Sequence, residues 1–143
     1  MLKLPPALLD AVKAHGEESY PFEGCGILLG SFTGDHREVA KVVRCRNIRT
    51  DSPRNRYSID PAELVRVQRE ARDLGLEIVG FYHSHPDHPA RWSSTDFAEA
   101  HWIGYSYLIT SVEGGRATES NSFVLTGRLE EDKAFRDEQL VIT

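Results

Sequence analysis

The spacing of apolar residues predicts helices and strands that alternate along the chain. In residues 5–15, Leu8, Leu9 and Val12 fall on one helical face, and two prolines suit the first turn. Gly16 is expected to close this helix. The first element of the chain is therefore predicted to be an amphipathic helix that packs one side against a core.

A second helix has the clearest start signal in the sequence. Asp60 can cap the first turn, Pro61 suits the first helical position, and Glu63 stands where the acid of a capping box belongs. Apolar residues then follow at helical spacing until a glycine ends the helix: Leu64, Val67, Ala71, Leu74 and Gly75.

Short apolar or alternating runs predict the strands. The expected strands are residues 26–31, 37–46, 77–84, 105–112 and 117–126. Within the second of them, Val39, Val43 and Cys45 are expected to face one side of the sheet. Glycine-containing turns are expected at 33–35 and 113–115.

Three segments complete the predicted order. Residues 47–57 are polar and form a loop near the upper end of ordinary loop lengths, which hints at a function. Residues 94–103 fit a short helix, and the charged tail 129–138 fits either a helix or a strand. This order predicts the α/β class, with one domain over residues 1–143 built as a mixed β-sheet flanked by helices.

Composition narrows the classes of function. The 143 residues suit one domain, and a hydrophobic content of 40% can build a core without disulfides. With a formal net charge of -5 and no dense Lys/Arg cluster, neither nucleic acid nor an anionic membrane is an expected partner. No run approaches 18 apolar residues, and the N-terminus lacks the core of a signal peptide, so we expect no membrane segment and no secretion.

The two cysteines favour a reducing, cytoplasmic location. Two thiols in a domain of ordinary size do not make a disulfide framework. Cys25 and Cys45 nevertheless fall on neighbouring predicted strands, so a bond between them stays open at this point.

The run His83-Ser84-His85-Pro86 carries the candidate chemistry. Side chains two apart on a strand share a face, so both histidines are expected to project together while Ser84 points away. Pro86 is expected to stop the strand and to leave the site at a sheet edge open to solvent.

Further along, Ser93 and Asp96 have the spacing of a helix N-cap and its third residue. The positive end of the helix favours an ionised Asp96. Two imidazoles and a carboxylate are three ligands of the kind that catalytic zinc uses, with a fourth position left for water. A spare glutamate, Glu23, could then act as the base.

Each of these features alone also has an ordinary structural interpretation. A His-x-His pair is commonly not a ligand pair, Ser93 with Asp96 can be a plain capping box, and an isolated Glu23 is typically a solvated acid. Periodicity does not place Glu23 near the histidines. Solvated or packed roles are the default for the neighbouring rings: His88, His101, Trp92 and Trp102.

The combined pattern resembles the JAMM (MPN+) metallopeptidase family. His83-Ser84-His85-Pro86, the gap to Ser93 and then Asp96 look like the zinc motif of that family. The upstream segment from Pro21 to Gly30 (PFEGCGILLG) resembles its catalytic-glutamate strand. No position of the Glu, His-x-His, Ser and Asp set is substituted, and the match extends over residues 21–96.

The resemblance implies a fold, a cofactor and a role for each residue. The fold would be the mixed-sheet sandwich of the MPN type, which is similar to that of cytidine deaminases. One zinc ion would be held by His83, His85 and Asp96. Glu23 would position water and act as general base and acid, and Ser93 would hydrogen-bond the oxyanion.

The resemblance also implies a substrate class. The family's usual substrates are peptide or isopeptide bonds after the C-terminal Gly-Gly of ubiquitin-like proteins, and an extended glycine tail could bind beside a sheet edge as an added strand. The compact chain is similar to small prokaryotic members, some of which process sulfur-carrier proteins. Homodimerisation, the identity of the carrier, the residue after the scissile glycine and the role of the 47–57 loop stay open.

Two other functions remain as alternatives. The first is a non-catalytic MPN-type scaffold for protein interactions, which some relatives of this fold have become. The second is a zinc hydrolase of small molecules such as a nucleobase deaminase, but the chain lacks the His-x-Glu and Cys-x-x-Cys that those enzymes use. It also lacks the His-Glu-x-x-His of helical zinc proteases.

Overall fold

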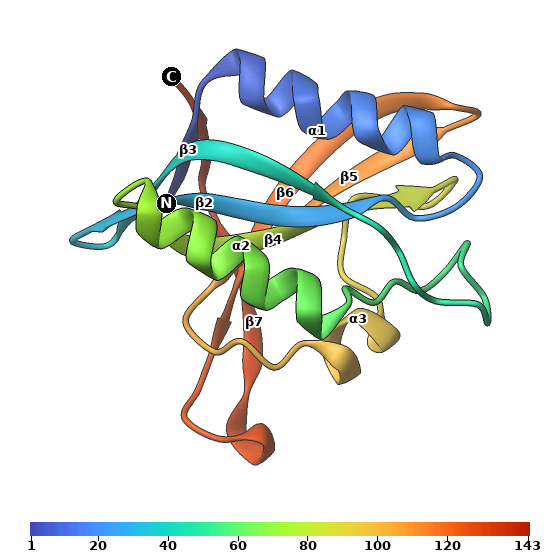
Figure 1. Cartoon of the computed structure of the whole chain (residues 1–143). Coiled ribbons are helices and arrows are strands. Elements are labelled where there is room, and N and C mark those ends of the chain that lie inside the picture. The colour runs from blue at the N-terminus through green and yellow to red at the C-terminus, as the bar shows by residue number, and fades with distance from the viewer.

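The computed structural model describes residues 1–143 and contains one eight-stranded sheet with three α-helices (Figure 1). The expected α/β class, a mixed sheet flanked by helices, is confirmed. In chain order the elements are β1 (Leu2–Leu4), α1 (Pro6–Ser19), β2 (Cys25–Thr33), β3 (His36–Cys45), α2 (Pro61–Asp73), β4 (Glu77–Pro86), α3 (Ser94–Glu99), β5 (Ser106–Glu113), β6 (Arg116–Thr126), a 3-10 turn (Glu130–Asp132), β7 (Ala134–Glu138) and β8 (Leu140–Ile142).

The sheet order is β7-β6-β5-β4-β2-β3-β1-β8. Strand β4 pairs with β2 in antiparallel fashion and with β5 in parallel. The strand that carries the histidines is therefore interior, and the expectation of a site at a sheet edge is wrong. Because β4 runs through both histidines as far as Pro86, the site lies at the end of a central strand.

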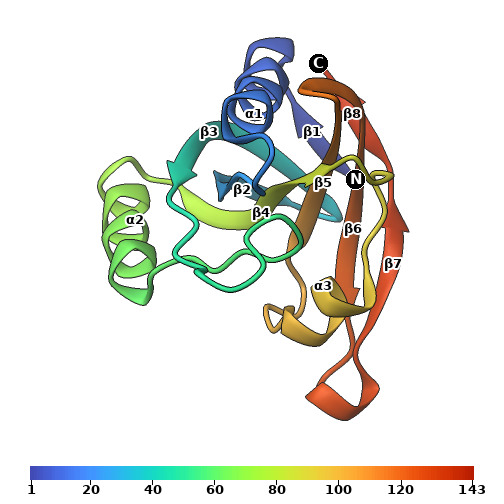
Figure 2. The ribbon, with the colours of Figure 1, turned by 90° about the vertical axis from the view of Figure 1, so that its right-hand side faces the viewer.

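The two outer strands of the sheet are joined by a single residue. Strands β7 and β8 lie at opposite ends of the strand order, but only Gln139 separates them in sequence. The carbonyl of Gln139 accepts a hydrogen bond from the amide of Leu2 in β1. The sheet therefore curls so that its two ends meet, as Figure 2 shows on the side of β6, β7 and β8.

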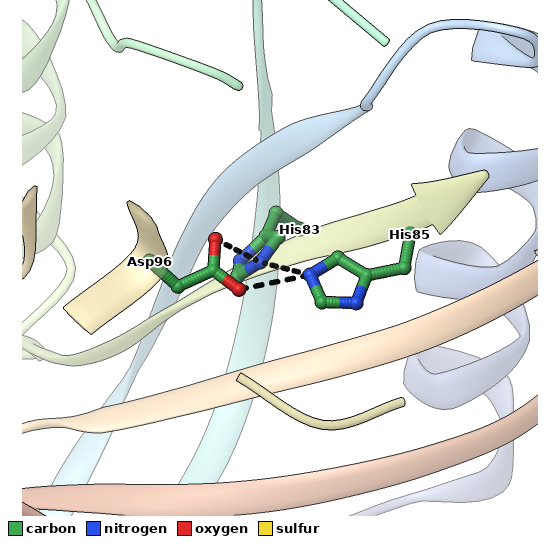
Figure 3. Close-up of side chains that lie close together, drawn as sticks. All are labelled: His83, His85 and Asp96. Atoms are coloured by element: carbon green, nitrogen blue, oxygen red, sulfur yellow. Dashed lines mark hydrogen bonds and ion pairs between the residues drawn. The ribbon is translucent and has the colours of Figure 1, made fainter. Parts of the chain in front are cut away.

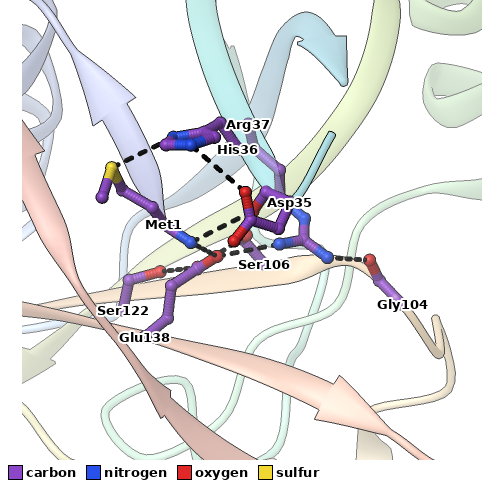
Figure 4. Close-up of polar contacts among 8 residues, drawn as sticks. All are labelled: Met1, Asp35, His36, Arg37, Gly104, Ser106, Ser122 and Glu138. Carbon is purple, nitrogen blue, oxygen red and sulfur yellow. Dashed lines mark hydrogen bonds and ion pairs between the residues drawn. The ribbon is translucent and has the colours of Figure 1, made fainter. Parts of the chain in front are cut away.

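A buried carboxylate connects the strands at this closure (Figure 4). The Glu138 side chain, 1% exposed, accepts hydrogen bonds from Arg37 at 2.9 Å, from Ser106 at 2.7 Å and from Ser122 at 2.8 Å. The Met1 ammonium lies 3.3 Å from the same carboxylate. Charge-assisted bonds compensate the cost of burying this charge, and they link β7 to β3, β5 and β6.

Helices cover both faces of the sheet. Helix α1 lies on one face and packs Leu9 and Val12 against β1, β2, β4 and β5 residues. Helix α2 lies on the other face with Val67 and Ala71 in contact with a second core cluster (Figure 2). None of the helices is long and apolar enough to cross a lipid bilayer.

Gly16 does not end the first helix, as the sequence had suggested, because α1 continues to Ser19. Gly16 is buried where α1 approaches the sheet most closely. A Cβ at this position would lie 3.0 Å from Val112 and 3.1 Å from the Cβ of Ser84. The glycine therefore serves close packing of the helix on β4 and β5 rather than termination.

A β-bulge changes the face to which one valine points. Leu29 pairs with Lys41 but Gly30 pairs with Val39, so Ala40 is an extra residue in β3. Val39 consequently packs on the α1 side of the sheet, whereas Val43 and Cys45 pack on the α2 side. The expectation that all three share a face is wrong because strict alternation fails across a bulge.

Helices α2 and α3 partly follow the sequence prediction. The Asp60 side chain caps α2 by accepting from the Ala62 amide at 2.9 Å, as expected. Glu63 does not close a capping box, since its carboxylate accepts from the Arg46 amide instead. Helix α3 ends at Glu99 rather than at residue 103.

The C-terminal tail resolves into a 3-10 turn followed by β7, so the strand interpretation is correct for its second half. The terminal strands β1 and β8 were not anticipated, because each is only three residues long. Cys25 and Cys45 face each other across β2 and β3, and both are free thiols.

We expect Glu138→Ala to lower the free energy of unfolding by about 3 kcal/mol, because Arg37 would keep a charge that has lost its buried partner. Urea unfolding of the variant measures this loss. The matched control is Glu131→Ala, an exposed glutamate without an ion pair, which should change stability by less than about 0.5 kcal/mol. Equal stability of the two variants would contradict a central role for Glu138.

Candidate metal centre

Strand β4 presents its two histidines on the same face, as the alternation of a strand requires. His83 is 2% exposed and His85 is 5% exposed, and their Nε2 atoms lie 3.1 Å apart. Ser84 points to the opposite face, where its hydroxyl accepts a hydrogen bond from the Gly24 amide at 2.8 Å. The pairing of β4 with β2 and β5 on both sides holds this arrangement rigid.

The start of α3 supplies the third group. The Ser93 hydroxyl accepts from the Asp96 amide at 3.0 Å, and the Asp96 carboxylate accepts from the Ser93 amide at 2.9 Å. This reciprocal capping box confirms the predicted N-cap. The cap also fixes the direction of the Asp96 side chain, which turns toward β4.

The carboxylate of Asp96 contacts both histidines (Figure 3). One oxygen lies 3.3 Å from Nε2 of His83 and the other 2.9 Å from Nε2 of His85. One ligand atom from each of the three residues lies within 4.8 Å of the others. Tetrahedral ligands at ordinary zinc distances are about 3.3 Å apart, so the three side chains fit one metal ion.

Hydrogen bonding sets the tautomer of His85. Its Nδ1 lies 2.8 Å from the carbonyl oxygen of Pro89, which can only accept, so Nδ1 carries the proton. Nε2 of His85 is therefore unprotonated in the neutral ring, and its lone pair is directed at Asp96 and His83. A histidine ligand oriented by a backbone carbonyl is a common arrangement in metal sites.

A stacked ring holds His83 instead. Its Nδ1 is buried without a hydrogen-bond partner, but the imidazole stacks on Tyr57 with centroids 4.6 Å apart. Burial lowers the pKa of His83, which favours the neutral form that a metal requires. The role of Tyr57 was missed in the sequence because only the fold brings the loop before α2 over the end of β4.

Asp96 is ionised despite its burial. Burial by itself would raise its pKa, but the interactions with the adjacent His83 and His85 rings lower it well below its ordinary range. A buried carboxylate that faces two imidazole nitrogens creates a site in which a cation is favoured. The donor set therefore matches a divalent metal.

Glu23 lies in the segment between α1 and β2 and lines the same cavity as His85 and Ser93. Its side chain is 3% exposed, and its Oε1 has no hydrogen-bond partner. Burial, followed by the negative charges of Asp96 and Glu99, raises its pKa to about 9. The interpretation of Glu23 as a solvated surface acid is therefore wrong.

Two cavities lie beside the centre. One, of about 430 Å³, is lined by polar residues together with one proline and one tryptophan: Glu23, Asn55, His85, His88, Pro89, Arg91, Trp92, Ser93 and Thr95. The other, of about 400 Å³, lies beyond Asp96 and has an aromatic wall of Tyr57, Phe81, Trp102 and Tyr107. Both tryptophans pack against aromatic rings, as expected: Trp102 lies edge-on to Phe81, and Trp92 lies against Phe97 and Phe135. Each also lines one of the two cavities, and Trp92 is 41% exposed.

The loop at 47–57 is fastened to the backbone of Glu23. The Asn47 side chain donates to the carbonyl of Glu23 at 3.2 Å and accepts from the amides of Arg49 and Ser58. The amide of Glu23 donates to the carbonyl of Pro53 at 2.9 Å. Asn47 was missed because a single asparagine in a polar loop gives only a weak signal in the sequence.

The family model described as "Prokaryotic homologs of the JAB domain" matches residues 5–126. The chain belongs to this family. The matched range contains all five residues of the predicted site, and the small prokaryotic JAMM resemblance is confirmed.

Named members of the JAB family are similar over most of their length. A desampylase from Haloferax volcanii is 37% identical, with 79% of this chain and 82% of the relative covered. A probable TtuB-protein conjugate cleaving protease from Thermus thermophilus is 35% identical over 82% of this chain and 74% of the relative. A CysO-cysteine peptidase from Mycobacterium tuberculosis is 30% identical over 87% and 84%.

Solved structures agree with the JAB fold. A solution structure of a Desulfitobacterium hafniense protein matches with a TM-score of 0.86 and 31% identity, covering all of this chain and 93% of the other. A Salinibacter ruber protein matches with a TM-score of 0.74 and 38% identity, covering 99% of this chain and 91% of the other.

We expect the protein to bind one divalent metal ion per chain and His83→Ala to lose that ion, because two ligands hold a metal far more weakly than three. Elemental analysis after dialysis measures the stoichiometry. His36→Ala is the matched control, since His36 lies at the start of β3 and its ring has polar contacts with Met1 and Asp35, away from the site. If His83→Ala retained as much metal as His36→Ala, His83 would not be a metal ligand.

Proposed function

We propose that this chain is a zinc metallopeptidase that hydrolyses the bond after the C-terminal Gly-Gly of a ubiquitin-like protein. The observation that carries the proposal is the meeting of His83, His85 and Asp96 at the end of β4, with Glu23 and Ser93 lining the adjoining cavity. The three named relatives support the substrate class, since their names describe cleavage of conjugates or extensions of small carrier proteins.

His83, His85 and Asp96 would hold the zinc ion. When bound, zinc supplies Lewis-acid chemistry that polarises an oxygen and makes water a better nucleophile at neutral pH. The complete set of donors speaks against the scaffold alternative. We also propose that residues 1–143 form a single JAMM domain and that the protein is cytoplasmic, which two buried free thiols support.

Glu23 is suited to move protons during hydrolysis. Its side chain is buried beside the histidines, and its unpartnered Oε1 is free to bind water, so the carboxyl is placed to accept a proton and return it. We propose that Glu23 accepts the proton that leaves the attacking water. The same carboxyl then delivers that proton to the amine as the C–N bond breaks, so that one water is consumed for each bond cleaved.

Ser93 is suited to stabilise the oxyanion. Its hydroxyl oxygen accepts from the Asp96 amide, and this leaves the hydroxyl proton free to donate into the cavity. A donor placed where negative charge develops lowers the barrier without having to reorganise. Ser93 would therefore serve both as helix cap and as oxyanion donor.

The Gly-Gly tail would reach the site across the cavities at the end of β4. Strand β4 is bonded to β2 and β5, so it offers no free edge along its paired length for an added strand. Glycines lack side chains, so they fit closely beside the buried ligands. Homodimerisation remains a prediction, and the apolar face of α1 is already buried against the sheet.

We expect Glu23→Gln to lower kcat by about 100-fold or more while zinc content is unchanged, because glutamine keeps the shape but cannot accept the proton. Cleavage of a Gly-Gly-linked carrier followed by mass spectrometry, together with elemental analysis, measures both quantities. Glu113→Gln is a control, since Glu113 is an exposed acid at the end of β5 without an ion pair. Normal turnover by Glu23→Gln would overturn the assigned role.

We expect Ser93→Ala to lower kcat by about 100- to 1000-fold through loss of the oxyanion donor. Loss of the cap costs about 1 kcal/mol of stability, which a parallel urea titration detects. Ser93→Thr retains a hydroxyl and should recover most of the activity, whereas Ser94→Ala tests the adjacent serine. If Ser93→Ala lost stability but not turnover, the serine would be a cap alone.

A further inference from the structure

We propose that three arginines around the catalytic cavity bind an acidic face of the folded ubiquitin-like partner, outside its tail. The three, named here the arginine rim, are Arg46, Arg54 and Arg91. This inference rests on the proposed function for the identity of the partner, and it adds how that partner is recognised.

Positive charge is concentrated beside the site although the whole chain carries a net charge of -5. Residues 44–56 contain five arginines and a single acid, Asp51. This segment runs from the end of β3 into the loop before α2, on the same end of the sheet as α3 (Figure 1). A local field of this sign attracts an anionic surface and orients its approach.

The rim residues have no acidic partner within the chain. Arg49 pairs with Asp51 and Glu99, and Arg56 approaches Glu99, so these two are already neutralised. The arginine rim has no ion pair, and all three of its side chains are exposed.

The acid that lies near Arg54 is also engaged elsewhere. Asp87 accepts hydrogen bonds from the Tyr20 hydroxyl and the Gly114 amide, although it feels the charge of Arg54. The rim charges are therefore available to an external partner.

Two rim residues line cavities that reach Glu23, and the third is adjacent in sequence to residues that line them. Arg91 lines the cavity that contains Glu23 and Ser93, and Arg46 lines a second cavity that also reaches Glu23. Arg54 is flanked in sequence by one residue of each cavity. Pro53 lines the cavity of Arg46, and Asn55 lines the cavity of Arg91.

Exposed apolar side chains accompany these charges. Phe22 is 48% exposed and lines the cavity beside Arg46, whereas Trp92 is exposed in the cavity beside Arg91. Aromatic and arginine side chains together are the composition of protein-binding hot spots. A folded protein with an acidic face fits this surface better than a nucleic acid does. The rest of this protein is acidic, so its surface outside the rim would repel the phosphates of a long nucleic acid.

The loop that carries Arg54 is held in one shape. Its Pro53 carbonyl and its Asn47 side chain bond to the backbone of Glu23, and Asn55 and Arg56 donate their amides to the carbonyl of Ser52. Binding to such a loop costs little ordering of the backbone. The expected contribution of the rim is electrostatic attraction, which acts on affinity and sensitivity to salt rather than on the chemical step.

The test uses the full chain and a small β-grasp protein that ends in Gly-Gly. This carrier is prepared in an acidic form and in a form whose tail-side Asp and Glu are changed to Asn and Gln. Fluorescence anisotropy measures Kd, and cleavage of an extended carrier is followed in parallel. We expect the acidic form to bind about tenfold more tightly, with most of this difference lost between about 50 and about 500 mM NaCl.

Charge reversal identifies the surface. Arg46→Glu with Arg54→Glu should weaken binding of the acidic form by about tenfold or more, and Arg46→Lys with Arg54→Lys should restore most of it. The matched control is Arg69→Glu with Arg72→Glu, two exposed arginines on α2 without ion pairs. This control should bind as the unchanged chain does.

The outcomes separate this inference from the proposed function. Rim-dependent binding without cleavage would support the rim and contradict the peptidase. If the carrier were cleaved but both carrier forms bound with equal Kd, and the Arg46/Arg54 reversal bound as well as the Arg69/Arg72 reversal, the role of the rim alone would be overturned. Absence of both binding and cleavage would overturn both. Tighter binding of single-stranded RNA than of the acidic carrier would also overturn the rim, since it would then be a nucleic-acid site.

Discussion

The contact of one carboxylate with two buried imidazoles is the interaction on which the rest of the site depends. Asp96 contacts both His83 and His85. All three side chains are too buried for water to solvate the carboxylate charge or to hydrogen-bond the imidazole nitrogens. Such a cluster is costly in a protein interior unless a positive charge balances it. The fold therefore accepts a local cost of stability at the end of β4, which a bound metal ion would relieve.

Rigid packing on both faces of the sheet keeps this cluster in place. On the face opposite the histidines, Ser84 accepts the Gly24 amide, and Gly16 lets α1 approach closely enough to cover that bond. The strand that carries the ligands is thus fixed to the segment that carries Glu23 by a contact outside the site. Positioning of catalytic groups by such surrounding bonds is what allows precise geometry.

Helix α3 is an unusual support because it is short and, apart from the Asp96 side chain, lies outside the buried core. Its first turn is held by the capping box and by the histidines. Beyond its last residue, Lys133 donates to the carbonyl of Ala100 at 2.9 Å. A six-residue helix has little stability of its own, so the site stabilises the helix as much as the helix positions Asp96.

Local rules predicted the parts of the site that are close in sequence. The period of a strand placed His83 and His85 together, and the spacing of Ser93 and Asp96 predicted the cap that the structure contains. The same rules failed where a non-local contact decides. The bulge at Ala40 reversed the face of Val39 relative to Val43 and Cys45, and no local pattern announces an extra residue.

Longer-range pairing explains the other differences. Strand β4 is interior because β5, which follows α3, pairs parallel to it. The sequence of β4 alone contains no signal for this pairing. The three-residue strands β1 and β8 exist only because the sheet closes through Gln139, so their sequences carry no strong signal. Glu23 could be connected to the histidines only through the family pattern, since the pairing of Cys25 with His83 is what brings the two segments together.

Two different parts of the fold control the two halves of the chemistry. The proposed metal ligands are held by the interior of the sheet and by the cap of α3, which leave them little freedom. The proposed base is held by a loop, because the amide of Glu23 is bonded to Pro53 and its carbonyl to Asn47. The 47–57 loop therefore both carries the unpaired Arg54 and supports the proposed catalytic carboxyl. Because this loop is held in one shape, a partner that binds Arg54 would leave the proposed proton acceptor in place, which agrees with an effect on affinity rather than on the chemical step.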